Sequence, residues 1–153
     1  MSAALAARIT DAVKAAMRAR DSTRLQTLRL LQAAIKQKAI DERITPDDAA
    51  ILAIIEKQAK QRRESIAAYS AANRPDSAAQ EQAELDILLE FLPQQAGPEE
   101  IATAVAAAIA QVQGQGLHGG AAMGAAMGQL KAALAGRADM AHVSSLVRQQ
   151  LAN

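Results

Sequence analysis

The sequence of 153 residues contains no cysteine and no tryptophan, and it has a single phenylalanine and a single tyrosine. The lack of cysteine excludes disulfides, thiolate metal sites and cysteine nucleophiles. Two histidines far apart in the chain argue against a zinc site, and we expect no bound metal and no small-molecule cofactor. Five valines and two aromatic residues cannot supply the alternating runs of a β-sandwich or barrel.

Long hydrophobic runs are also missing. The longest mainly apolar stretch without charge, residues 101–112, is half alanine and shorter than the roughly 20 residues that a membrane span needs. At the start of the chain, Arg8 and Asp11 interrupt any signal-like run. The sequence therefore predicts a cytoplasmic protein that does not associate with membranes.

Alanine is abundant instead, with 39 copies that make up about half of the apolar residues. Alanine is the best helix former, and the Gln, Glu, Lys, Arg and Leu that accompany it follow closely. The composition predicts an all-α protein.

The chain is expected to divide near residue 95, because Pro93, Gly97 and Pro98 interrupt any continuous helix there. We predict an N-terminal four-helix bundle domain over residues 1–93, a linker at 94–97 and a small three-helix module over 98–153. Two helices are expected before residue 45, the first through the stripe from Leu5 to Met17 and the second through Leu28 and Leu31. The other five are expected at about 45–73, 76–92, 98–113, 121–135 and 139–151.

The net charge of +1 hides a strong segregation of charge along the chain. Residues 1–40 contain eight basic and two acidic residues, residues 57–63 contain four basic residues and no acid, and residues 76–90 contain five acids and no base. Such basic helices can follow a phosphate backbone, although a solvated face balanced by the acidic helix is the plainer alternative. The candidate nucleic-acid-binding residues are Arg29, Lys36, Lys57, Lys60 and Arg63. Because aromatic residues are so scarce, any RNA contact should be directed at backbone and shape.

Arg62 differs from these neighbours because helical periodicity places it on the apolar face of its helix, with Ile55 and Ile66. Glu81 lies on the apolar face of the next predicted helix. If the two helices form an antiparallel hairpin at Arg74-Pro75, we expect Arg62 to meet Glu81 or Glu84 as a structural ion pair.

Glycine-containing motifs are the remaining candidates. Residues 114–119 match the pattern G-x-G-x-x-G, but a dinucleotide site needs a preceding strand, so we interpret them as an interhelical loop and His118 as an exposed loop residue. Gly120, Gly124 and Gly128 recur within a predicted helix, which predicts close approach of a neighbouring helix or, as an alternative, of a nucleic-acid backbone. No catalytic residues are evident from the sequence.

The order of several short motifs resembles the GatB/YqeY family, and in particular its free-standing YqeY-like branch. In the first half these are residues 28–29, 60–66, 74–76, 81–85 and 91–93, and in the second half residues 123–127, 136–140 and 143–151. The likeness covers essentially the whole chain. Ala125 and Met140 stand where members of the family often carry a lysine and a glycine.

This resemblance implies a relation to the tRNA-contacting tail module of the glutamine-dependent aspartyl/glutamyl-tRNA amidotransferase. The function it implies is that of a non-catalytic accessory protein associated with tRNA or with amidotransferase subunits. One alternative is a component of a carbon–nitrogen ligase with glutamine as amido-N-donor, acting with partner proteins that supply the missing catalytic residues. A helical protein–protein adaptor is the other alternative.

Overall fold

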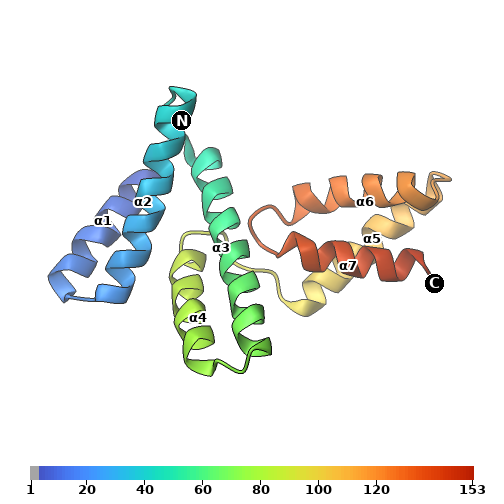
Figure 1. The fold of residues 1–153 in the computed structure, drawn as a ribbon. Coiled ribbons are helices and arrows are strands. Elements are labelled where there is room, and N and C mark those ends of the chain that lie inside the picture. The colour runs from blue at the N-terminus through green and yellow to red at the C-terminus, as the bar shows by residue number, and fades with distance from the viewer. Residues whose placement is uncertain (1–3) are drawn as a thin grey trace. The chain divides into compact units, whose positions relative to one another are not determined.

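The computed structural model describes residues 4–153 and confirms the all-α prediction, with seven helices and no strand among those residues (Figure 1). The helices are α1 (Ala4–Ala19), α2 (Ser22–Glu42), α3 (Asp48–Ala71), α4 (Pro75–Leu89), α5 (Pro98–Gly114), α6 (Gly119–Ala133) and α7 (Met140–Leu151). None of them is long and apolar enough to cross a membrane.

The chain divides into two compact units, Met1–Pro93 and Gln94–Asn153, and each has its own hydrophobic core. The first unit contains the hairpins α1–α2 and α3–α4, which the α2–α3 turn connects (Figure 1). The second unit contains α5, α6 and α7.

Local sequence explains how the helices of the first unit begin and end. The Asp21 carboxylate accepts a hydrogen bond from Arg24 N and caps α2, and Asp47 accepts one from Ala50 N and caps α3. The expected start of α3 at Thr45-Pro46 was therefore wrong by two residues. Pro75 occupies the first turn of α4, where a missing N–H is tolerated, so the chain reverses after α3 as the hairpin prediction required.

The first unit is held together by aliphatic side chains from all four helices. Its core consists mainly of Leu5, Ile9, Leu28, Leu31, Ile51, Ile55, Leu88 and Phe91. The apolar stripe expected on α1 ends before Met17, whose exposed fraction is 51%.

The second unit has a core of small and medium side chains. Its buried residues are Ile101, Val105, Ala108, Ile109, Val112, Ala122, Ala126, Leu130, Leu134, Val143 and Val147. Ala122 and Ala126 are fully buried on α6, and such small side chains allow adjacent helices to approach closely.

The glycines of α6 do not make the close contact that we expected of them. Gly120, Gly124 and Gly128 are not buried, and a Cβ atom built on any of them meets nothing within 4 Å. They are two positions away from Ala122 and Ala126, which rotates them by about 200° to the opposite side of the helix. The prediction of close helix approach at these glycines was therefore wrong, because alanines occupy the packed face.

The segment 94–97 is tied to the loop between α6 and α7. Ala96 N donates to Arg137 O at 2.7 Å, the Gln95 side-chain amide donates to Gly136 O at 2.8 Å, and Arg137 Nε donates to Gln94 O at 2.9 Å. Arg137 also forms an ion pair with Glu100 at 2.7 Å. These residues are thus an anchored part of the second unit.

Candidate nucleic-acid interface

The five basic residues predicted to bind nucleic acid lie on two helices of the first unit. Arg29 and Lys36 are on α2, Lys57, Lys60 and Arg63 are on α3, and none of the five is buried. Within residues 4–153, none of the five takes part in an ion pair or hydrogen bond through its side chain. Their positive charges are therefore available to an external anion.

Other basic side chains of the same unit have partners. Arg24 Nη1 lies 2.6 Å from Glu90 Oε2, and this hydrogen bond raises the pKa of Arg24 although partial burial opposes the shift. Lys38 Nζ lies 2.8 Å from Glu42 Oε1 one turn away. Arg24 and Lys38 therefore form ion pairs within the first unit, whereas the five candidate residues have no such partner within residues 4–153.

The free cations do not form one continuous patch. Lys57 lines a hollow between α2 and α3, whereas Lys36 lines a different hollow between α1 and α2, beside Ile9 and Thr10. On α3, Lys57, Lys60 and Arg63 are three residues apart, so each is turned by about 60° from the one before. The structure therefore places Lys57 and Lys60 near each other and puts Lys36 on another side of α2.

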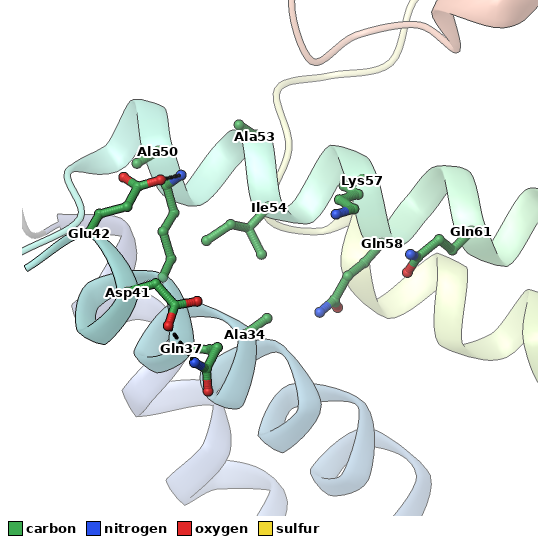
Figure 2. Close-up of a pocket in the computed structure, with 11 residues that line it drawn as sticks. Ala34, Gln37, Asp41, Glu42, Ala50, Ala53, Ile54, Lys57, Gln58 and Gln61 are labelled. Atoms are coloured by element: carbon green, nitrogen blue, oxygen red, sulfur yellow. Dashed lines mark hydrogen bonds and ion pairs between the residues drawn. The ribbon is translucent and has the colours of Figure 1, made fainter.

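The hollow between α2 and α3 has a volume of about 510 Å³ and a mixed lining (Figure 2). Ala34, Ala50, Ala53 and Ile54 give it apolar walls. Gln58 extends from α3 toward α2, and Asp41 accepts a hydrogen bond from Gln37 at 2.7 Å on the α2 side (Figure 2). Such a surface offers hydrogen-bond donors, acceptors and one free ammonium group from Lys57.

Arg62 lies between the two carboxylates that helical periodicity had suggested. Its Nη1 atom is 3.3 Å from Glu81 Oε2 and 3.5 Å from Glu84 Oε2. The exposed fractions of the three side chains are 20%, 17% and 15%, so the cluster is largely shielded from water. The contacts join α3 to α4 and leave Arg62 unavailable to an RNA phosphate.

Gln58 lies one turn before Arg62 on α3, and the sequence did not indicate that polar atoms of both residues are buried without a partner. Gln58 Oε1 and Arg62 Nε are both buried without a hydrogen-bond partner. They are an acceptor and a donor four residues apart on one helix, a spacing at which side chains are neighbours.

The contacts of Arg8 could not be predicted from the sequence, because the residues it contacts are more than 80 positions away in the chain. Its guanidinium lies 5.5 Å from the centre of the Phe91 ring and donates to Glu90 O at 3.3 Å. No local sequence pattern links these residues.

The other motifs remain without a chemical role in the described part of the chain. Gly114 ends α5 and Gly119 begins α6, so the glycine-rich segment connects two helices, and His118 is exposed there. Among residues 4–153 there is no group of three or more His, Cys, Asp or Glu side chains that could hold a metal ion.

The sequence of the chain is similar to those of known proteins. The sequence pattern of a family described as "Yqey-like protein" matches residues 6–151. A protein of Pyrenophora tritici-repentis named "Altered inheritance of mitochondria protein 41, mitochondrial" is 30% identical over 145 residues, which cover 93% of this chain and 78% of the relative.

Two proteins with the same name match shorter parts of the chain. The one from Vanderwaltozyma polyspora is 36% identical over 61% of this chain, and the one from Eremothecium gossypii is 38% identical over 56% of it. The matched regions span 52% and 48%, or about half, of these two relatives.

These names contradict the expectation of a cytoplasmic protein, because they point to a mitochondrial rather than a cytoplasmic location. That expectation was based on the lack of a signal-like run and of a membrane span. Both features can also be lacking in a protein that resides inside an organelle, so they did not justify the choice of compartment.

Proposed function

Because this chain belongs to the YqeY-like family, we propose that it is a non-catalytic accessory protein that associates with tRNA. The observation that carries the proposal is the set of five basic side chains on α2 and α3 that have no anionic partner within residues 4–153. Each phosphate that such a cation neutralises releases condensed counterions, which favours binding at low salt.

The proposal assigns most of the RNA contact to α3. Lys57, Lys60 and Arg63 follow one another around about 120° of this helix, so they can meet phosphates along a curved backbone. Arg29 and Lys36 would extend the contact on another side of α2. A surface with these features recognises backbone geometry and charge, and it has no aromatic platform on which bases could stack.

The proposal also treats the two compact units as separately folding domains, four helices in the first and three in the second. The second unit would contact the tRNA body or an amidotransferase, as the family resemblance implies. Since both the only tyrosine and the only phenylalanine lie in the first unit, tyrosine fluorescence reports on that unit alone. Two domains should give a urea transition by fluorescence that differs from the transition by circular dichroism at about 222 nm.

A gel-shift titration with unmodified tRNA at two salt concentrations tests RNA binding. We expect a complex at low salt that weakens steeply as salt is added. Reversal of three charges in Lys57→Glu/Lys60→Glu/Arg63→Glu should weaken binding at least about tenfold and make the dependence on log[salt] shallower by roughly 2–3.

The matched control keeps the charges and exchanges the side chains, as Lys57→Arg/Lys60→Arg/Arg63→Lys. This variant should bind tRNA within about twofold of the unaltered protein, because nonspecific phosphate contacts depend mainly on charge. Absence of a low-salt complex, or equal binding by the charge-reversed variant, would refute the proposal.

A further inference from the structure

Helix α2 carries large apolar side chains on two opposite sides. Leu28 and Leu31 are fully buried in the core of the first unit, whereas Leu30 and Ile40 are 54% and 60% exposed. A helix that packs against its protein on one side normally has polar residues on the other. The outward apolar residues of α2 therefore have no explanation within the first unit.

The outward residues follow the spacing of a coiled-coil seam. Gln26, Leu30, Ala33, Gln37 and Ile40 alternate in steps of four and three, and all of them are exposed. At about 100° per residue they lie within an arc of about 80°. Isolated exposed aliphatic residues need no explanation, but this regular spacing is the one with which a second helix packs. We call these five residues the α2 seam.

One edge of the α2 seam is basic. Arg29 and Lys36 each precede a seam residue, Leu30 and Gln37, and occupy the positions that pair with charges on a partner helix. Both are free of ion pairs within residues 4–153. On the other edge, Ala34 is uncharged and Asp41 already accepts a hydrogen bond from Gln37.

From this arrangement we propose that α2 docks an amphipathic helix of a partner protein, with leucine-like residues along its seam and acidic residues along the facing edge. The partner helix is expected to be acidic along this edge because acidic side chains there would complement the charges of Arg29 and Lys36. The proposed function in RNA binding is not required for this docking.

Charge also argues against antiparallel pairing of α2 with the α2 of a second copy. In an antiparallel pair of α2 helices, equivalent edges face each other, so Arg29 and Lys36 would meet the same residues of the other copy. The acidic helix of a second copy does not fit either, because the outward residues of α4 include Gln82, Ala83 and Asp86 and no large aliphatic side chain.

Gln37, the polar residue in the middle of the α2 seam, favours a protein helix over a lipid surface as the partner of the seam. If the seam entered a bilayer, Gln37 would have to leave water together with the Asp41 carboxylate that accepts its hydrogen bond, and burying that charge in lipid is costly. Between two helices a polar seam residue such as Gln37 is tolerated and helps to fix the register. An RNA phosphate, in turn, gains nothing from Leu30 and Ile40.

The probe for this proposal is a synthetic helical peptide of about three heptads, with leucine at every seam position and glutamate along both edges. Its partner probe is the same peptide with lysine along both edges. Like charges on both edges discourage each peptide from pairing with itself. We expect the glutamate peptide to bind the full chain at least about tenfold more tightly than the lysine peptide, as measured by fluorescence anisotropy.

Two double variants distinguish the contribution of the apolar seam residues to peptide binding from that of the basic edge. Leu30→Gln/Ile40→Gln should weaken binding of the glutamate peptide at least about tenfold and leave tRNA binding unchanged. Arg29→Glu/Lys36→Glu should reverse the preference between the two peptides. Met17→Gln is the control, since Met17 is similarly exposed but lies on α1, and it should bind the glutamate peptide like the unaltered chain.

All altered residues are exposed, and thermal melting monitors that each variant remains folded. Three results would overturn the proposal: equal binding of the two peptides, binding unaffected by Leu30→Gln/Ile40→Gln, or self-association of the chain that this double variant abolishes. Binding to vesicles of equal parts phosphatidylglycerol and phosphatidylcholine that requires Leu30 and Ile40, without peptide binding, would also overturn it in favour of a membrane. A failure of tRNA binding would refute the proposed function and leave this docking site in place.

Discussion

Replacement of Arg62 by methionine would leave Glu81 and Glu84 facing the same shielded space without their cation. At 3.3 and 3.5 Å, each pair attracts by about 5 kcal/mol at an effective dielectric constant near 20. Two effects reduce the net loss, because the side chains keep some contact with water and because the buried, unpartnered Arg62 Nε disappears with the substitution. The expected cost lies between that of a broken buried pair, about 3–5 kcal/mol, and that of an exposed pair, below about 1 kcal/mol.

We therefore expect Arg62→Met to lower the free energy of unfolding of the first unit by about 2–3 kcal/mol. Urea unfolding followed by tyrosine fluorescence measures this unit alone, because Tyr69 is the only tyrosine and there is no tryptophan. With a dependence of about 1.5 kcal/mol per molar urea, the midpoint should fall by roughly 1.5 M.

Two further variants make the result specific to the ion-pair cluster. Lys60→Met removes an exposed and unpaired cation from the same helix and should change stability by less than about 0.5 kcal/mol. Arg62→Met/Glu81→Gln/Glu84→Gln removes the opposing charges as well and should recover stability to within about 1 kcal/mol of the unaltered chain. If Arg62→Met costs no more than Lys60→Met, or the triple variant shows no recovery, the electrostatic reasoning is wrong.

Three other expectations concern helix ends and the second unit. Gly124→Ala/Gly128→Ala should stabilise the second unit by about 1–2 kcal/mol and raise its melting temperature by several degrees in calorimetry, because both sites are helical and open; a lowered melting temperature would contradict this. Asp47→Ala should cost about 1 kcal/mol in the urea assay through loss of the α3 cap, whereas Asp47→Asn should retain most of the stability. Arg137→Met should lower the melting temperature of the second unit, seen by circular dichroism, by an amount equivalent to about 1–2 kcal/mol, and an unchanged melt would show that the Arg137 contacts contribute nothing.

Much of the helical architecture could be predicted from local signals. Asp21 and Asp139 directly precede α2 and α7, and the carboxylate of each accepts a hydrogen bond from a backbone N–H in the first turn of its helix, which is a local signal of a helix start. At the start of α3 the helix was expected to begin at about residue 45, whereas Asp47 is the residue that caps it. The neighbouring Asp48 accepts a hydrogen bond from Leu5 N, 43 residues away, and such a tertiary contact is invisible in a short window.

The sequence distinguished exposed basic residues from the ion-paired Arg62, but it did not reveal how the exposed ones are arranged. Periodicity along α3 separated Arg62, which contacts Glu81, from Lys57 and Lys60, which are exposed. Periodicity could not show that Lys36 and Lys57 line different hollows, because that depends on how α2 packs against α1 and α3. The glycines of α6 illustrate the same limit, since a repeat of small residues does not reveal which side of a helix is packed.

The anchored segment 94–97 determines where the second unit can be separated from the first when it is fused to another protein. The prolines at 93 and 98 suggest that a cassette could begin at Pro98, with the preceding residues as disposable spacer. Gln95 and Ala96 donate hydrogen bonds to the carbonyls of residues 136 and 137, and Gln94 O accepts one from the Arg137 side chain, so such a cut removes part of the folded unit. A gene fusion that preserves the module should therefore join its new partner before Gln94, and its natural boundary is set by the α6–α7 loop rather than by the prolines.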